Sequence, residues 1–259
     1  MMPHAKKAFG QNWLVDETVV EKIIQASEIA PGEIVLEIGP GTGVLTQALV
    51  DAGAQVVAVE ADETLINSLQ ERFGSQIQLV SGDILSIDLT FLPREYKLIA
   101  NIPYNITSDI LRRFLTIEPK PTRMVLMVQK EVADRIVAMP GDMSLLSVMC
   151  QLYAKTRRVT KVPAGAFRPM PKVDSAVVQF DLIDPEQRWG IDPEPVIRLA
   201  KIGFSSRRKQ LHGLLKQSAG LDSNQLKQVF QEMNLDPLVR AERLTVENWI
   251  ELTHTLSKN

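Results

Sequence analysis

The chain has 259 residues and a formal net charge of −2, with 45% hydrophobic and 23% charged residues, as in an ordinary folded protein. This length accommodates one large core and a small second domain. One cysteine excludes an internal disulfide, and the three histidines are too scattered to predict a metal site. No apolar segment approaches membrane-spanning length and the first residues lack the apolar core of a signal peptide, so we expect a cytoplasmic protein.

The net charge of −2 conceals one acidic and one basic stretch of the chain. Residues 33–97 contain ten acidic and three basic side chains, whereas residues 155–216 contain thirteen basic and six acidic ones. Such a division suits a protein in which one half holds a neutral or cationic ligand and the other faces a polyanion. Six cations between Lys155 and Lys172 come without an intervening acid. For the acidic half, a solvated surface is the alternative interpretation.

Residues 1–15 are predicted to form an irregular arm. Two aromatic and two amide side chains within residues 9–14 suggest a segment that folds over a ligand, and simple anchoring of the arm to the core is the alternative. From Asp16 onward the apolar residues have helical spacing, with Asp16 as a suitable N-terminal cap. This helix is expected to end near the Pro-Gly pair at 31–32.

Alternating short apolar segments and helical patterns come next and decide the fold class. This alternation predicts a doubly wound α/β sheet with parallel strands, expected in the order 3-2-1-4-5 for its first five strands. The predicted strands are 34–38, 55–60, 76–80, 97–100, 123–128, 157–162 and 175–182. The predicted helices among them are 45–51, 63–73, 107–115, 130–138 and 145–154.

A linker beginning at Asp184 ends the alternation, and after Asp192 only helical spacing remains. We therefore predict an α/β domain over residues 1–186 and a small all-helical domain over residues 187–259. The predicted helices of the second domain are 196–204, 207–215, 223–233 and 246–256.

The strand at 97–100 is followed by Asn101, Ile102, Pro103 and Tyr104. Proline fixes its own backbone angle and keeps the preceding residue extended, so we expect the Ile102 carbonyl beside the Asn101 side-chain oxygen. These two acceptors and the flat ring of Tyr104 match an exocyclic amino group on a stacked heterocycle. For these four residues alone, a strand end, a turn and a helix start are the alternative interpretation.

A glycine-rich turn at Gly39, Gly41 and Gly43 follows the first predicted strand. The dinucleotide fingerprint G-x-G-x-x-G would need glycine at position 44, which is Val44, so the pattern disfavours a pyrophosphate-binding loop. In the expected strand order, the first and fourth strands are neighbours. The glycine turn and Asn101 should therefore face the same cleft.

Two carboxylates follow the intervening strands. Glu60 ends the second strand and suits the two hydroxyls of a ribose. Asp83 follows the third strand beside the apolar Ile84 and suits an adenine amino group, although Asp83 is also a common turn residue. The glycine turn, Glu60, Asp83 and Asn101 at successive strand ends together suggest S-adenosylmethionine as the cofactor.

These motifs and two longer segments, 9–14 and 167–175, resemble the ribosomal RNA adenine N6,N6-dimethyltransferase family, most closely its bacterial small-subunit (16S) members. The resemblance covers nearly the whole chain, although Trp13 and Ile102 stand where the family usually has phenylalanine and leucine. It implies a Rossmann-like S-adenosylmethionine-dependent methyltransferase sheet followed by a small all-helical, RNA-contacting domain.

The motifs and the resemblance together give an expected set of site residues. The expected cofactor contacts are Asn12, Leu14, Gly39, Gly41, Glu60, Asp83, Ile84 and Asn101. The residues expected to hold the target adenine are Asn101, Ile102, Pro103 and Tyr104, with Phe167 against the base. The expected RNA contacts are Arg168, Lys172, Arg207, Arg208 and Lys209.

The family substrate is a pair of adjacent adenosines in the loop of the 3′-terminal hairpin of small-subunit rRNA, each dimethylated. The resemblance therefore implies an enzyme of ribosome biogenesis that acts within an immature 30S-type particle, as a monomer and without a metal ion. The alternatives are a large-subunit rRNA methylase, a DNA adenine methylase, and a ribosome-assembly checkpoint factor whose binding outweighs its catalysis.

Overall fold

The computed structural model describes residues 11–219 and 222–257. The chain divides into two compact units, Met1–Ala133 with Lys155–Leu182, and Asp134–Ala154 with Ile183–Asn259. The predicted division between residues 186 and 187 lies near the last of these boundaries. The segment Asp134–Ala154, however, groups with the helical unit, because its helix α6 (Leu145–Tyr153) packs against helices that come later in the chain.

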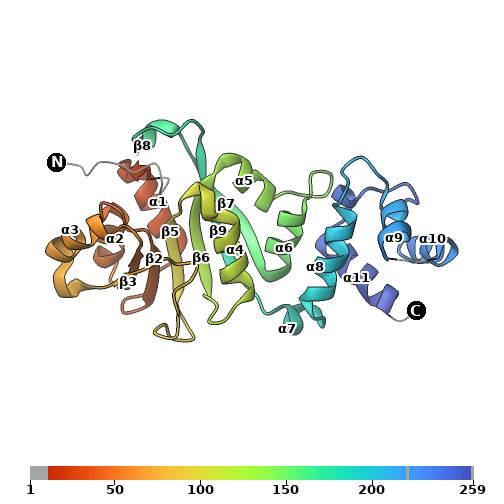
Figure 1. Ribbon diagram of the computed structural model, residues 1–259, viewed down its shortest axis with the longest axis horizontal. Coiled ribbons are helices and arrows are strands. Elements are labelled where there is room, and N and C mark those ends of the chain that lie inside the picture. The colour runs from red at the N-terminus through yellow and green to blue at the C-terminus, as the bar shows by residue number, and fades with distance from the viewer. Residues whose placement is uncertain (1–10, 220–221, 258–259) are drawn as a thin grey trace. The chain divides into compact units, whose positions relative to one another are not determined.

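A seven-stranded sheet forms the centre of the first unit (Figure 1), in the order β4-β3-β2-β5-β6-β9-β7. The five strands from β4 to β6 are parallel, whereas β9 runs antiparallel to β6. The predicted α/β class and the order 3-2-1-4-5 are confirmed. The strands are β2 (Ile34–Ile38), β3 (Gln55–Glu60), β4 (Ile77–Ser81), β5 (Lys97–Asn101), β6 (Arg123–Gln129), β7 (Ala154–Val162) and β9 (Ser175–Leu182).

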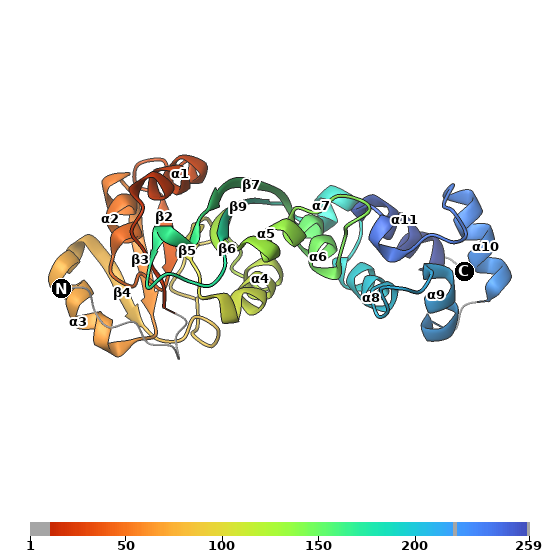
Figure 2. The same cartoon turned by 90° about the horizontal axis from the view of Figure 1, so that it is seen from above.

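Helices cover both faces of this sheet, which explains why its strands read as apolar runs. On one face, the buried side chains of three helices join those of the strands in one core cluster. On the opposite face lies α4 (Thr107–Thr116), with Ile110 and Phe114 fully buried (Figure 2). The three helices of the first face are α1 (Glu17–Ser27), α2 (Val44–Asp51) and α3 (Glu63–Phe73).

Near residue 11, where the described part of the chain begins, the helix cap was predicted correctly and a small sheet was not predicted. Asp16 caps α1 as predicted, because its Oδ1 accepts hydrogen bonds from the backbone N–H groups of Thr18 and Val19. A two-stranded sheet was missed, in which β1 (Trp13–Leu14) pairs antiparallel with β8 (Phe167–Arg168). Two-residue strands are too short to show periodicity. Residues 1–10 of the predicted arm lie outside the described residues.

Helices make up the described part of the second unit. Trp249 is fully buried there, and its ring centroid lies 5.7 Å from that of Phe204. The helices are α6 (Leu145–Tyr153), α7 (Pro185–Trp189), α8 (Pro193–Gly203), α9 (Leu211–Ala219), α10 (Ser223–Glu232) and α11 (Val246–Ser257). The short helix α5 (Lys130–Ile136) spans the boundary between the units. Among the described residues, no helix is long and apolar enough to cross a bilayer.

Three helix starts in the second unit differ from the prediction. Helix α8 begins at Pro193, three residues before the predicted start. Helix α7 lies in the predicted linker, where Asp184 caps it and Pro185 occupies its first turn. Helix α9 begins at Leu211, four residues after the predicted start, because apolar periodicity begins only there. Residues 207–209 consequently lie in a turn before α9.

Candidate functional site

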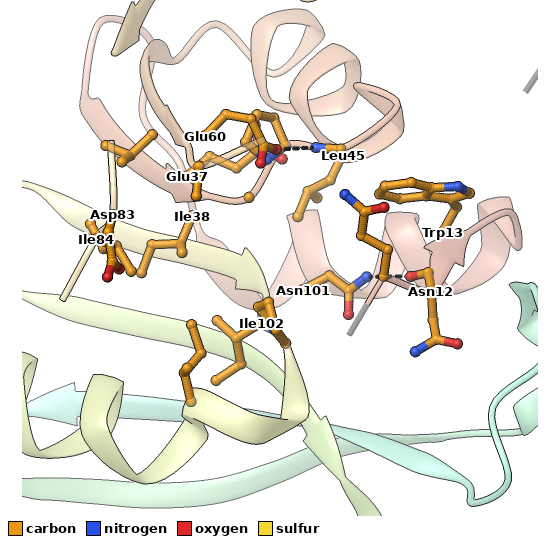
Figure 3. A pocket seen from close by; sticks show the side chains of 18 of the residues that line it. Asn12, Trp13, Glu37, Ile38, Leu45, Glu60, Asp83, Ile84, Asn101 and Ile102 are labelled. Atoms are coloured by element: carbon orange, nitrogen blue, oxygen red, sulfur yellow. Dashed lines mark hydrogen bonds between the residues drawn. The ribbon is translucent and has the colours of Figure 1, made fainter. Parts of the chain in front are cut away.

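A pocket of about 490 Å³ lies at the carboxyl ends of β2, β3, β4 and β5, with β1 contributing to its lining. Because β2 lies between β3 and β5 in the sheet, the segments that follow these strands meet at one edge. The volume falls within the range of small-molecule sites, about 300 to 1,000 Å³. Figure 3 shows the labelled side chains arranged around this pocket.

The glycine turn after β2 lines the pocket with its backbone. Gly39 and Gly41 have φ values of 62° and 59°, which side chains of L-residues rarely adopt. A Cβ atom on Gly39 would meet no protein atom within 4 Å, whereas one on Gly41 would lie 2.6 Å from Cζ3 of Trp13. The turn is therefore open to a ligand at Gly39 and held by the Trp13 ring at Gly41.

Glu60 ends β3, lines the pocket and is 5% exposed. Its Oε2 accepts a hydrogen bond from the Gly41 N–H at 3.2 Å, and its Oε1 accepts one from the Asp62 N–H at 2.9 Å. Burial raises the pKa of Glu60, and these N–H groups oppose the rise. The Ala61 N–H acts on the same carboxylate, and the remaining acceptor capacity of Glu60 is available to a ligand hydroxyl.

Glu37 also lines the pocket, although it is not among the site residues expected from the sequence. Its side chain is 1% exposed, and within the described part of the chain its Oε2 has no hydrogen-bond partner. Burial raises the pKa of Glu37 to about 8, the Thr46 hydroxyl opposes this rise, and the nearby negative charge of Glu60 adds to it. The signal in the sequence was a carboxylate inside the otherwise apolar strand β2.

Asp83 and Ile84 line the pocket after β4, as predicted, with Ile84 buried and Asp83 exposed. Asp83 is also a turn residue, because its Oδ1 accepts a hydrogen bond from the Leu85 N–H at 2.9 Å. The loop that follows is held by Arg113 of α4, which donates to the carbonyl groups of Leu85 and Ile87. The two interpretations of Asp83 are therefore compatible.

Asn101 ends β5 and faces the N-terminal segment across the pocket (Figure 3). Its Nδ2 donates a hydrogen bond to the backbone carbonyl of Asn12 at 3.2 Å. A carbonyl oxygen only accepts hydrogen bonds, so this contact fixes which end of the Asn101 amide is nitrogen. The Asn101 Oδ1 is left as an oriented acceptor, and Asn12 and Leu14 lie at the pocket as predicted.

Ile102, Pro103 and Tyr104 also line the pocket. Pro103 has φ −59° and ψ 134°, so the chain stays extended before the turn Tyr104–Ile106 leads into α4. The Tyr104 Oη lies 2.6 Å from Oγ of Ser175, the first residue of β9. Burial raises the pKa of Tyr104 above its ordinary value, and the hydrogen bond with Ser175 opposes the rise.

The expectation for Phe167 requires a correction. Phe167 is fully buried in the core cluster and is not among the residues that line the pocket. It pairs with Leu14 between β8 and β1, and its side chain packs inward from there. In this structure, Phe167 therefore supports the arm, and no face of its ring is available to a base.

The residues expected to contact RNA are exposed, and they fall into two groups. In the first unit, Arg168 ends β8 and Lys172 lies between β8 and β9. Arg168 donates to the carbonyl groups of Gly165 and Phe167. Arg207, Arg208 and Lys209 lie in the second unit. Each unit therefore carries a group of exposed cations of its own.

The pocket fits S-adenosylmethionine by its volume and by the polar groups that line it. The open backbone at Gly39 admits close approach, Glu60 offers acceptors to a ribose diol, and Asp83 with Ile84 offers an acceptor beside an apolar surface. Glu37 adds a buried carboxylate oxygen without a partner among the described residues, which suits a cationic group.

A family model described as ribosomal RNA adenine dimethylase matches residues 2–258. The ribosomal RNA small subunit methyltransferase A of Thermosynechococcus vestitus is 43% identical, over 98% of each chain. The protein of the same name from Dehalococcoides mccartyi is 39% identical, over 98% of this chain and 89% of its own.

Two solved structures share the fold. A dimethyladenosine transferase from Plasmodium falciparum has a TM-score of 0.83 and 28% identity, with 95% of this chain and 97% of the other covered. The 23S rRNA methyltransferase ErmE has a TM-score of 0.79 and 26% identity, with 95% and 100% covered. On the whole-chain match to its model and the identities to its relatives, this chain belongs to the ribosomal RNA adenine dimethylase family.

Proposed function

We propose that this protein transfers methyl groups from S-adenosylmethionine to the N6 atoms of two adjacent adenosines in the 3′-terminal hairpin loop of small-subunit rRNA. The observation that carries the proposal is the oriented amide of Asn101, whose nitrogen is held by the Asn12 carbonyl at the edge of the cofactor pocket. The relatives named small subunit methyltransferase A support the choice of subunit. The fold alone does not decide it, because a 23S rRNA methyltransferase shares it.

The chemistry needs a reactive amino nitrogen, and adenine N6 is a weak nucleophile because its lone pair is delocalised into the ring. In the proposed complex, the Asn101 Oδ1 and the Ile102 carbonyl accept the two N–H groups and favour a pyramidal nitrogen with a free lone pair. Bound S-adenosylmethionine supplies an activated methyl group on its sulfonium. Positioning and electrostatics by fixed acceptors then suffice, without a general base before attack.

Tyr104 covers one face of the extruded base in this proposal. A base–aromatic contact is worth about 1 to 3 kcal/mol and offsets part of the cost of removing the base from its stack. The Tyr104 hydroxyl takes no part in the chemistry, because it is engaged with Ser175. We propose that the substrate is rRNA within an immature 30S-type particle, and that Arg168, Lys172 and the turn 207–209 contact its phosphates.

The first prediction tests Asn101 directly. Replacing one preorganised polar group at a transition state typically costs about 3 to 4 kcal/mol, so Asn101→Ala should slow methyl transfer about a hundredfold or more. The measurement is single-turnover methylation of small subunits that lack the modification, at saturating cofactor, with cofactor affinity measured by calorimetry and particle binding by sedimentation. Asn67→Ala, at an exposed asparagine of α3, is the matched control.

The expected pattern is an Asn101→Ala variant that binds the particle and no longer methylates it. Near-parental methylation at saturating cofactor would remove Asn101 from the site. Methylation by the parent protein of large-subunit rRNA in preference to the small subunit would overturn the proposed substrate.

A further inference from the structure

The topology of the sheet brings Ser175 to the site from a distant part of the sequence. Strand β9 runs antiparallel to β6, so its first residue lies at the edge where the parallel strands end. Ser175 pairs with Gln129 at the end of β6, just as Asn101 at the end of β5 pairs with Met127. A serine 71 residues after Tyr104 thereby reaches its hydroxyl.

Ser175 is a rigid anchor. Its side chain is fully buried, and the residue before it is held twice. The Asp174 carbonyl accepts a hydrogen bond from the Lys130 N–H at 2.9 Å, and the Asp174 Oδ1 accepts one from the Ala164 N–H at 3.0 Å. Tyr104, in contrast, is only half buried and lies in a short turn at the pocket. The contact therefore joins the half-buried Tyr104 to a fully buried residue whose backbone is held in place.

We propose that Ser175 is a positioning residue for methyl transfer, which holds the Tyr104 ring in the orientation that covers the target adenine. The inference rests on the proposed function. The hydroxyl oxygen of a tyrosine lies on the axis about which its ring rotates, so a contact at that oxygen restrains the direction of the axis. The 2.6 Å contact between the two hydroxyls therefore fixes where the Tyr104 ring stands at the pocket. The contact also explains why residue 104 is a tyrosine, since phenylalanine has the same ring but no hydroxyl to bond with Ser175.

A double-mutant cycle over Ser175→Ala and Tyr104→Phe separates positioning from general packing. Each single variant should lower the single-turnover methylation rate about three- to tenfold, the usual effect of one hydrogen bond, at unchanged cofactor affinity. The double variant should be no slower than either single one, because both remove the same contact. Ser27→Ala deletes another fully buried serine hydroxyl of the first unit, on α1, and should leave the rate unchanged.

A second readout does not depend on the reaction. The chain has three tyrosines, so ring-labelled tyrosine gives three NMR signals, and Tyr104→Phe identifies one of them. Ser175→Ala should move the Tyr104 signal, because the ring loses its contact at the hydroxyl, while the signals of Tyr96 and Tyr153 stay in place.

Additive losses in the cycle, an equal loss in Ser27→Ala, or an unmoved Tyr104 signal would each overturn the role of Ser175. A parent protein that methylates no adenosine of small-subunit rRNA would instead overturn the proposed function. In that case the NMR experiment still decides whether Ser175 orients the ring.

Discussion

Glu37 is a buried acid at the pocket whose ordinary charged form is disfavoured. Its pKa is raised to about 8 chiefly by burial, so the folded protein holds a proton there that the unfolded chain releases near pH 4.5. A group with a raised folded-state pKa contributes stability that is complete below the unfolded value and is lost as the pH rises through the folded value. Glu37 therefore destabilises the unliganded protein increasingly between about pH 4.5 and pH 8.

The corresponding prediction concerns Glu37→Gln, which keeps the shape of the side chain and removes the ionisation. Between pH 5 and pH 9, the free energy of unfolding of the parent should fall relative to that of the variant, by on the order of a few kcal/mol. Urea unfolding of both proteins across this range measures the difference. The control is Glu71→Gln at an exposed position of α3, and parallel curves for Glu37→Gln and the parent would contradict the prediction.

Single residues show where sequence reasoning succeeds and where it stops. The positions of Glu60, Asp83 and Asn101 were predictable because each lies at the end of a strand or just after it, and parallel strand ends meet at one edge. The inward direction of Phe167 was not predictable, because it depends on the pairing of two strands of two residues each. The role of Glu37 was missed since burial, which shifts its pKa, is a property of the packed fold.

At the scale of elements, the arm and the glycine turn depend on each other. Strand β1 is held by β8, and its Trp13 ring lies against the backbone of Gly41. Trp13 is the position at which the sequence departs from the family's usual phenylalanine. The larger ring leaves no room for a side chain at position 41, so this chain needs glycine there for its backbone angle and for its contact.

Gly41→Ala and Gly39→Ala form a matched pair that tests this packing. The two φ values, 59° and 62°, are nearly equal, so the strain of a side chain in the left-handed region is common to both variants. Only Gly41→Ala also forces a Cβ atom to 2.6 Å from the Trp13 ring. We expect the melting temperature to fall several degrees further for Gly41→Ala, and adding Trp13→Phe should recover part of that loss. Equal losses in the two glycine variants would show that strain alone matters.

The elements of the sheet were predictable to within a few residues, because their apolar runs and punctuating turns are strong signals. The start of α9 was predicted four residues early, because the prediction included the polar residues 207–210, whereas the apolar periodicity begins only at Leu211. The grouping of α6 with the second unit, in contrast, depends on contacts between helices far apart in the chain.

For the whole molecule, the acidic and basic stretches of the sequence lie where their proposed roles need them. The acidic stretch 33–97 builds most of the cofactor pocket, and the basic stretch 155–216 supplies exposed cations in each of the two units. A net charge of −2 alone would argue against a nucleic-acid partner. The distribution of the charges along the chain, with a basic stretch at 155–216, instead favours a nucleic-acid partner.

A triple variant of the second unit tests this reading. Replacing Arg207, Arg208 and Lys209 by alanine should weaken binding to small-subunit rRNA and lower the slope of log affinity against log salt by about two, since each lost phosphate contact removes about 0.7 to 0.9. Binding measured by fluorescence anisotropy at several salt concentrations gives the slope. The control replaces Arg94, Lys201 and Lys227, which are also exposed, and so changes the total charge equally. The same slope change in both variants would mean that net charge alone acts.

The hydrogen bond between Asn101 and residue 12 has an evolutionary consequence, because its acceptor belongs to the main chain. Every amino acid presents the same carbonyl, so the identity of residue 12 can drift while the acceptor stays in place. A comparison of sequences would record no correlated change between the two positions. The geometry at Asn101 is instead inherited through the route of the chain, which Trp13 and Leu14 maintain by their pairing with β8.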